Sequence, residues 1–334
     1  MASAAGIAGW CLLHAALAAV STVLARKYAL QRRMLDEPGE RRSHQVATPR
    51  GGGIAIVISV LLALAWLGWT LPEQRDLIAA IALGLLLVAG VGWRDDHRPL
   101  SAWWRLLAHA LAAVLVGWAA WRQGVPALFA LTGAAAILVL INFWNFMDGI
   151  DALAASQAAL AALTLALLAG APLAFWLALA LASACVGFLP FNLPRARIFL
   201  GDVGSGALGY LLGVVWLMSA SGTGSRWLLL SLPFSAFAID AGLTLVARMV
   251  AGERWWSAHT DHLYQRMARR EGHGRVSACY AAWTLAAMAL AWALRQSSPA
   301  VMMCAATIWH LIGAGAWYVF TYKDRRNAMQ RIDS

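Results

Sequence analysis

The segment NFWNFMDGID, residues 142–151, places two amides and two carboxylates at the end of a long apolar run. Asn142, Asn145 and Asp148 recur at every third position, so on a helix they advance by about 60° per step and share one flank. Polar groups at membrane depth are costly and are kept mostly where they face a cavity, a partner or an ion. Oxygen ligands suit a hard cation such as Mg²⁺. The segment therefore predicts one wall of a cation site, and the alternative is a polar helix end whose hydrogen bonds are satisfied locally.

A pair of adjacent carboxylates, Asp95 and Asp96, follows another apolar segment in the sequence WRDDHRPLS, residues 93–101. Neighbouring acids that emerge from a membrane helix are costly unless they bind a cation or a proton. Aspartate pairs also occur in prenyl-chain transferases, which bind pyrophosphate through Mg²⁺. A further acid normally follows in those enzymes, and Pro99 stands in its place here. The pair therefore predicts a second part of a cation or phosphate site, with a solvated helix end as the alternative.

A further acid, Asp202, lies in the glycine-rich sequence FLGDVGSG, where the next apolar segment begins. A carboxylate beside a turn with many backbone N–H groups can hold a metal while the turn binds phosphate. Arg195 and Arg197 add positive charge a few residues before it. We therefore expect Asp202 to belong to the same site as the acidic segments above.

Two basic connections carry further polar groups. In TPRGGG, Arg50 is followed by three glycines that open an apolar segment, a pattern that favours phosphate at a helix N-terminus. The alternative is a flexible hinge in a positively charged loop. The second connection holds a dense set of functional groups: His259, Asp261, His262, Tyr264 and Arg266. Zinc ligation, a substrate clamp and a solvated basic loop all fit it, and we favour the clamp because no cysteine or glutamate completes a zinc set.

The elements that must position these groups are membrane helices. The chain has 334 residues, of which 61% are hydrophobic and 13% charged, with a mean hydropathy of +0.65. Soluble domains do not have this composition, whereas membrane bundles do. Apolar windows that approach or reach the length of a bilayer crossing lie near residues 3–25, 52–71, 77–92, 103–120, 127–146, 152–170, 172–191, 206–220, 227–247, 277–295 and 300–320. We therefore predict one all-α integral membrane domain, residues 1–334, a polytopic bundle of about 10–11 transmembrane helices.

The basic residues predict the orientation of this bundle. Twenty-two of the 26 lysines and arginines fall in alternate connections, and the others are Arg75, Arg122, Arg226 and Arg295. Positively charged loops remain on the cytoplasmic side of a membrane. We therefore expect the N-terminus outside, the C-terminus in the cytoplasm and the polar motifs at the cytoplasmic face. The net charge of +10 then reflects topology and contact with the lipid bilayer, not binding of nucleic acid.

The distribution of acids separates an enzyme from an ion- or proton-coupled transporter. Intramembrane acids often mark transport pathways, and Asp240 lies within an apolar segment, where pairing with Arg248 is the other interpretation. A transporter needs polar residues through the thickness of the membrane, whereas nearly all of the acids here lie in or beside the predicted cytoplasmic connections. This asymmetry favours an enzyme that takes one substrate from the cytosol and the other from the membrane.

Together, these motifs resemble those of the polyprenyl-phosphate N-acetylhexosamine-1-phosphate transferase superfamily. The resemblance covers about residues 36–270 with the motifs in family order, and TPRGGG, DDHRPLS and HTDHLYQRM are similar to the branch that initiates O-antigen synthesis. It implies transfer of sugar-1-phosphate from a UDP-N-acetylhexosamine to undecaprenyl or another polyprenyl phosphate, which releases UMP and forms a polyprenyl-pyrophosphoryl sugar. The implied location is the cytoplasmic face of a bacterial inner membrane. The implied cofactor is Mg²⁺, with Mn²⁺ as a substitute, and a homodimer is left open.

The resemblance also implies roles for individual residues. The expected catalytic residues are Asp95, Asp96 and Asp202, the first two as the acidic pair that faces the lipid phosphate. Asp202 and Asn145 would be the leading metal ligands. The expected substrate-binding residues are His44, Arg50, Asn142, Asp148, Asp151, Phe199, His259, His262 and Arg266. Phe199 would lie against the uracil, residues 142, 148 and 151 would line the nucleotide pocket, and the loop 259–266 would hold the sugar and pyrophosphate.

The chain departs from the family pattern at three places. Gly39 stands where relatives often have asparagine, and Ala152 replaces a frequent glycine. The histidine-rich segment is reduced to His262 followed by Leu-Tyr-Gln-Arg. These departures leave the histidine roles and the sugar open.

The expected chemistry needs little base catalysis. A phosphate monoester has its second pKa near about 6 and is already largely dianionic at neutral pH. Asp95 would therefore position the nucleophile or remove a residual proton. A covalent aspartyl-phosphate is the alternative route, and we favour direct displacement.

Overall fold

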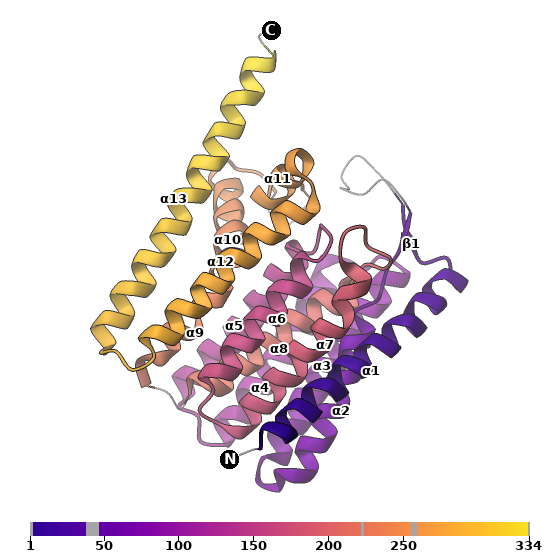
Figure 1. The fold of residues 1–334 in the computed structure, drawn as a ribbon, viewed down its shortest axis with the longest axis vertical. Helices are drawn as coiled ribbons and strands as arrows, with labels where there is room; N and C mark the ends of the chain where they lie inside the picture. The colour runs from indigo at the N-terminus through magenta and orange to yellow at the C-terminus, as the bar shows by residue number, and fades with distance from the viewer. Residues whose placement is uncertain (1–2, 38–46, 222–223, 255–258, 333–334) are drawn as a thin grey trace.

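The computed structural model describes residues 3–37, 47–221, 224–254 and 259–332, which form a bundle of helices (Figure 1). The long helices are α1 (Ala4–Gln31), α2 (Ile54–Thr70), α3 (Arg75–His97), α4 (Ala102–Arg122), α5 (Ala127–Phe146), α6 (Leu153–Leu168), α7 (Pro172–Asn192), α8 (Asp202–Ala220), α10 (Ser235–Val250), α12 (His273–Leu294) and α13 (Pro299–Ile332). The short helices are η1 (Pro72–Gln74), η2 (Gly224–Arg226), α9 (Trp227–Leu230), η3 (Leu232–Phe234) and α11 (Leu263–Glu271). Two short strands, β1 (Leu35–Asp36) and β2 (Thr48–Pro49), pair antiparallel with Leu35 opposite Pro49.

The helices confirm the predicted class. Within the described residues, nine candidate spans are long and apolar enough to cross a membrane, and α2 and α6 are apolar but shorter. The chain is therefore an all-α polytopic membrane protein. One predicted window differs in detail, because residues 227–247 divide into α9, η3 and α10 around Pro233, which lacks the N–H group that would continue a helix. The side on which each terminus lies stays a prediction.

Helix α8 forms the centre of the bundle. In its apolar window 94% of the residues are buried, and it packs against α3, α5, α6 and α7. Gly209 and Gly213 allow α5 to approach closely, since a Cβ atom at Gly209 would stand 2.3 Å from the carbonyl oxygen of Leu140. Small residues four positions apart commonly produce such close packing in membranes. The packing of α8 thereby fixes its first residue, Asp202, at one end of the bundle.

The motif-bearing segments meet at this end. The carboxyl ends of α3 and α5 and the starts of α4 and α8 come together there, as their side-chain contacts show. Figure 1 shows that β1 and α11 lie at one end of the molecule and that the N-terminus of α1 lies at the other. The polar end is therefore made by elements that are far apart in the sequence.

The backbone conformation of Ala152 accounts for the glycine that the family pattern often has at this position. It precedes α6 with φ = 64°, in the left-handed region that favours glycine, and its N–H donates to Asn192 Oδ1 at 3.0 Å. An L-residue with a Cβ atom is disfavoured in this conformation by about 1–2 kcal/mol. The chain thus keeps the backbone conformation for which glycine is suited, although alanine stands there.

We expect Ala152→Gly to stabilise the protein by about 1 kcal/mol, because glycine adopts the left-handed conformation without strain. The measurement is the thermal unfolding midpoint of the detergent-solubilised protein. The matched control is Ala158→Gly inside α6, which should destabilise by about 0.5–1 kcal/mol because glycine weakens a helix interior. A lower midpoint for Ala152→Gly would contradict this explanation.

Candidate active site

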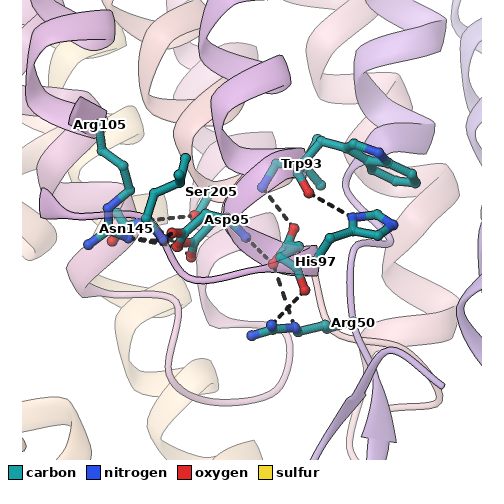
Figure 2. Close-up of polar contacts among 11 residues, drawn as sticks. Arg50, Trp93, Asp95, His97, Arg105, Asn145 and Ser205 are labelled. Carbon is teal, nitrogen blue, oxygen red and sulfur yellow. Dashed lines mark hydrogen bonds and ion pairs between the residues drawn. The ribbon is translucent and has the colours of Figure 1, made fainter. Parts of the chain in front are cut away.

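Two of the predicted acids meet on one arginine. Arg105, in the first turn of α4, donates from Nη1 to Asp95 Oδ2 at 3.0 Å and to Asp202 Oδ2 at 2.9 Å (Figure 2). Asp95 comes from the end of α3 and also accepts a hydrogen bond from the backbone N–H of Leu100. The two carboxylates, 107 positions apart in the sequence, therefore share one positive charge.

Asn145 completes this cluster from the end of α5. Its Nδ2 donates to Asp202 Oδ1 at 3.3 Å and to Ser205 Oγ at 3.2 Å (Figure 2). The structure thus brings together Asp95, Asn145 and Asp202, which sequence analysis assigned to one site. We call these three residues and Arg105 the carboxylate cluster.

Arg105 is a candidate site residue that the sequence motifs did not indicate. In the sequence it is one of the 22 positive charges whose distribution predicts topology. A usable signal was its position, because it lies one turn into the helix that follows DDHRPLS. A cation placed there stands beside the acidic pair whenever α4 turns back against α3, and these two helices do pack together.

Asp96 has a different environment from its neighbour Asp95. Its side chain is buried, and its two oxygens accept hydrogen bonds from the backbone N–H groups of Asp202 and Val203, both at 3.1 Å. These are the first two amides of α8, where the helix dipole favours negative charge. Gly201 permits this approach, since a Cβ atom there would stand 2.6 Å from Asp96 Oδ2. Asp96 thus caps α8 from another helix.

This cap corrects the expectation that the glycine-rich turn binds phosphate through its amides. The first two N–H groups of α8 already donate to Asp96, and those of Gly204 and Ser205 donate to the carbonyl of Gly201. The physical reason is that a helix N-terminus attracts an anion, and the chain supplies its own. The predicted catalytic role of Asp96 stays a prediction, whereas its contacts are those of a positioning residue.

Two of the three glycines after Arg50 donate their N–H groups to other segments of the protein. Gly52 N–H donates to the carbonyl of Phe199 at 2.9 Å, and Gly53 N–H donates to that of Leu200 at 2.8 Å. These bonds join the TPRGGG segment to the residues that precede Asp202. The expectation that these two amides bind phosphate is therefore wrong, because they satisfy backbone carbonyls of a neighbouring segment.

Arg50 contacts Asp96 near the carboxyl end of α3. Its Nη2 donates to the backbone carbonyl of Asp96 at 2.6 Å, and its Nε lies 3.9 Å from Asp96 Oδ1 (Figure 2). Phe199 is partly buried, and its N–H donates to the carbonyl of Pro49 at 2.8 Å. Its contact with uracil stays a prediction. His44 lies outside the described residues.

The remaining polar groups of the segment 142–151 separate in space. Asn142 donates from Nδ2 to the carbonyl of Leu138, four residues earlier on its own helix, at 2.7 Å. The carboxylate of Asp151 accepts from Ala196 N–H at 3.1 Å and lies 3.2 Å from His273 Nδ1. These contacts join Asp151 to the loop before α8 and to α12. The nucleotide contacts predicted for both residues stay predictions.

Asp148 lies within electrostatic range of Asp202 in the carboxylate cluster. Burial, followed by the negative charges of Asp202, Asp96 and Asp36, raises the pKa of its carboxyl group well above the usual range. A group of acids that repel one another in this way is stabilised by a bound cation or by protonation. Either a proton on Asp148 or a cation nearby would relieve this repulsion.

The histidine loop lies against the end of α5. The rings of His259 and His262 have centroids 4.8 Å apart, and His262 stacks on Phe146 at 6.1 Å. Arg266 donates from Nη1 to the carbonyl of Asp261 and from Nη2 to Thr321 Oγ1 at 2.7 Å. The described part of the loop, residues 259–266, is therefore packed against Phe146 and Thr321 and is not a bare solvated connector. Its contact with substrate stays a prediction.

We expect acidification to lower the local stability of the histidine loop, residues 259–266. Burial, followed by the charges of His262 and Arg248, lowers the pKa of His259 from 6.5 to about 4, and burial lowers that of His262. Because the folded pKa values are depressed, this stability is complete above pH 6.5 and is lost as the pH falls toward 4. Amide hydrogen exchange of residues 259–264, corrected for intrinsic rates, should rise between pH 7.5 and 5. Unchanged protection of these amides from exchange between pH 7.5 and 5 would contradict the expected loss of stability.

The carboxylate cluster fits magnesium better than zinc. No three His, Cys, Asp or Glu side chains within the described part of the chain gather as a metal-binding group. The cluster instead offers two carboxylates and the amide oxygen of Asn145. Mg²⁺ is usually bound through one or two carboxylates together with substrate phosphates, so a partial set of oxygen ligands suits it.

Residues 78–220 match the model of the family described as "Glycosyl transferase family 4". The chain carries a glycosyl transferase family 4 domain. The domain holds Asp95, Arg105, Asn145 and Asp202, so the carboxylate cluster lies within it. The superfamily predicted from the motifs is confirmed at this level. The O-antigen-initiating branch stays a prediction.

Curated proteins that are similar to this chain are named as transferases. "Phospho-N-acetylmuramoyl-pentapeptide-transferase" of Synechococcus sp. (strain JA-3-3Ab) is 32% identical over 55% of this chain and 60% of the relative. "Probable undecaprenyl-phosphate N-acetylglucosaminyl 1-phosphate transferase" of Bacillus subtilis (strain 168) is 26% identical over 60% and 59%. "Decaprenyl-phosphate N-acetylglucosaminephosphotransferase" of Mycolicibacterium smegmatis is 29% identical over 69% and 67%. The chain thus spans about three fifths of the length of the first two relatives.

Proposed function

We propose that this protein is a Mg²⁺-dependent phosphoglycosyltransferase. It transfers the sugar-1-phosphate of a UDP-N-acetylhexosamine to undecaprenyl phosphate or a similar polyprenyl phosphate, and it releases UMP. The observation that carries this proposal is the carboxylate cluster at one end of an apolar bundle, inside a glycosyl transferase family 4 domain. An acceptor dissolved in the bilayer and a donor dissolved in water can both reach such a position.

The relatives support the two substrate classes. Two of their names include a polyprenyl phosphate and an N-acetylglucosamine group. We propose an N-acetylhexosamine donor on this basis, at the cytoplasmic face of a bacterial inner membrane. The product would begin O-antigen or another polysaccharide of the cell envelope.

The proposed reaction is a direct displacement at phosphorus. An oxygen of the polyprenyl phosphate forms a bond to the β-phosphorus of the donor. The bond from that phosphorus to the oxygen bridging the α- and β-phosphates breaks, and UMP leaves with the bridging oxygen. Both substrates are anionic, so catalysis depends mainly on positioning and on positive charge.

The residues of the carboxylate cluster divide these tasks. Asp202, Asn145 and Asp95 would hold Mg²⁺, which when bound supplies positive charge to the pyrophosphate oxygens. Arg105 presents a guanidinium group at the same place and can pair with a phosphate oxygen. Asp95 also positions the attacking phosphate or accepts its residual proton. Asp96 and Arg50 hold the end of α3 and the start of α8 in register.

The test is UMP release by the purified protein. We expect release that requires a UDP-N-acetylhexosamine, undecaprenyl phosphate and Mg²⁺ together, and that stops after chelation with EDTA and returns with Mg²⁺ or Mn²⁺. A panel of UDP-GlcNAc, UDP-GalNAc, UDP-FucNAc and UDP-QuiNAc would identify the sugar. Undiminished activity after exhaustive chelation would contradict the metal requirement, and release that does not need the lipid would contradict the transfer reaction.

A further inference from the structure

Asp240 is a buried acid that the proposed reaction does not use. It lies in α10, its side chain is 2% exposed, and its two oxygens accept several hydrogen bonds. The donors are Leu263 N–H at 2.8 Å, Tyr264 N–H at 3.0 Å, the Tyr280 hydroxyl at 2.7 Å and the Thr244 hydroxyl at 3.3 Å. Each oxygen of this buried carboxylate therefore has two hydrogen-bond donors.

The contacts of Asp240 contradict both interpretations that the sequence offered. Arg248 pairs instead with Glu253 and Asp261. A proton or ion pathway needs a group that is open to its cargo, whereas both oxygens of Asp240 are held by the donors above. Asp240 therefore has a structural task within the protein.

That task resembles the one that Asp96 performs at α8. The N–H groups of Leu263 and Tyr264 are the first two of α11, and Asp240 binds them as Asp96 binds the first two of α8. A buried aspartate on a neighbouring helix thus neutralises each helix N-terminus. The two helices that start in this way carry Asp202 and the end of the histidine loop.

Helix α11 is also connected to the carboxylate cluster. The hydroxyl of Tyr264 donates to the carbonyl of Phe146, the last residue of α5, at 3.0 Å. Asn145 directly precedes Phe146, and the ring of His262 stacks on that of Phe146. A shift at the start of α11 therefore moves the histidine loop relative to Asn145.

We propose that Asp240 is a positioning residue that fixes the N-terminus of α11 and thereby holds the His259–Arg266 segment beside the Asn145 end of α5. It acts through α11 on binding of the soluble donor and does not touch the reacting atoms. The kinetic part of this proposal rests on the proposed function. The structural part, that one carboxylate fixes α11, does not.

The test compares Asp240→Asn and Asp240→Ala with Thr244→Val. Asparagine keeps one acceptor oxygen, alanine keeps none, and valine removes only one of the hydroxyls that contact Asp240. We expect amide hydrogen exchange at residues 263 and 264 to rise at least about tenfold in Asp240→Ala, less in Asp240→Asn and little in Thr244→Val. Exchange at residues 202 and 203, which Asp96 caps, should stay unchanged in all three.

The kinetic readout separates positioning from general loss of structure. We expect the KM for the donor to rise about tenfold in Asp240→Asn, with kcat and the KM for the lipid changed less than about threefold. Unchanged exchange at residues 263 and 264 in a folded Asp240→Ala variant would overturn the proposal. A fall in kcat at unchanged donor KM in Asp240→Asn would also overturn it. A wild-type protein without transferase activity would overturn the proposed function, and the exchange data would still decide whether Asp240 holds α11.

Discussion

Asp202→Asn is expected to reduce the kcat of UMP release at least about a thousandfold. The carboxylate of Asp202 accepts hydrogen bonds from both Arg105 and Asn145, so it is the group that links the members of the carboxylate cluster. Asparagine removes one negative charge and one acceptor oxygen there, which weakens the hold on a divalent cation. The measurement is single-substrate kinetics with UDP-N-acetylhexosamine at saturating undecaprenyl phosphate and Mg²⁺.

The matched control is Asp76→Asn, because Asp76 is an exposed acid in the first turn of α3, away from the cluster at the other end of that helix. We expect its kcat to stay within about twofold of the wild-type value. The thermal unfolding midpoint of both variants should show that they are folded. Full turnover by Asp202→Asn would contradict the metal-binding role.

Arg105→Met is expected to change turnover and cation binding in opposite directions. Arg105 places one positive charge between two carboxylates, so a divalent cation at that place must compete with it. Its removal should tighten Mn²⁺ binding about tenfold in the absence of substrates, because one competing charge has gone. The kcat should nevertheless fall about a hundredfold, because a positive charge near the phosphates has been lost.

Binding of Mn²⁺ to the detergent-solubilised protein can be followed by electron paramagnetic resonance without any turnover. Arg122→Met is the control, since Arg122 is an exposed arginine at the far end of the same helix. It should leave both quantities unchanged. Mn²⁺ affinity that does not change in Arg105→Met would show that the arginine and the metal do not share the two carboxylates.

Much of the cluster was predictable from local pattern. Asp95, Asn145 and Asp202 each stand where an apolar segment ends or begins, and helix ends at one face of a bundle necessarily lie near one another. The spacing of Asn142 and Asn145 was less informative. Asn142 lies one turn deeper in the apolar bundle, where its amide is satisfied by the carbonyl of Leu138 on the same helix.

The acidic pair shows why neighbours in sequence can have different tasks. Adjacent residues on a helix point about 100° apart, so a single helix end cannot direct Asp95 and Asp96 to the same place. One carboxylate meets Arg105, and the other meets the first amides of α8. The direction of each depends on where α4 and α8 pack against α3, and the pair itself does not encode that.

The sequence by itself determined the all-α membrane class, the long apolar segments, the similarity to glycosyl transferase family 4 and most of the residues that we propose as oxygen ligands. These properties follow from hydropathy, from residue types and from the order of motifs along the chain. Only the tertiary structure decided which backbone amides remain for a ligand, and it assigned Asp96 and Asp240 to the caps of α8 and α11 and Arg105 to the shared carboxylates. The physical reason is that buried polar groups are costly without hydrogen-bond partners, and the amides that Asp96 and Asp240 cap lie 23 to 107 residues away from them in the sequence.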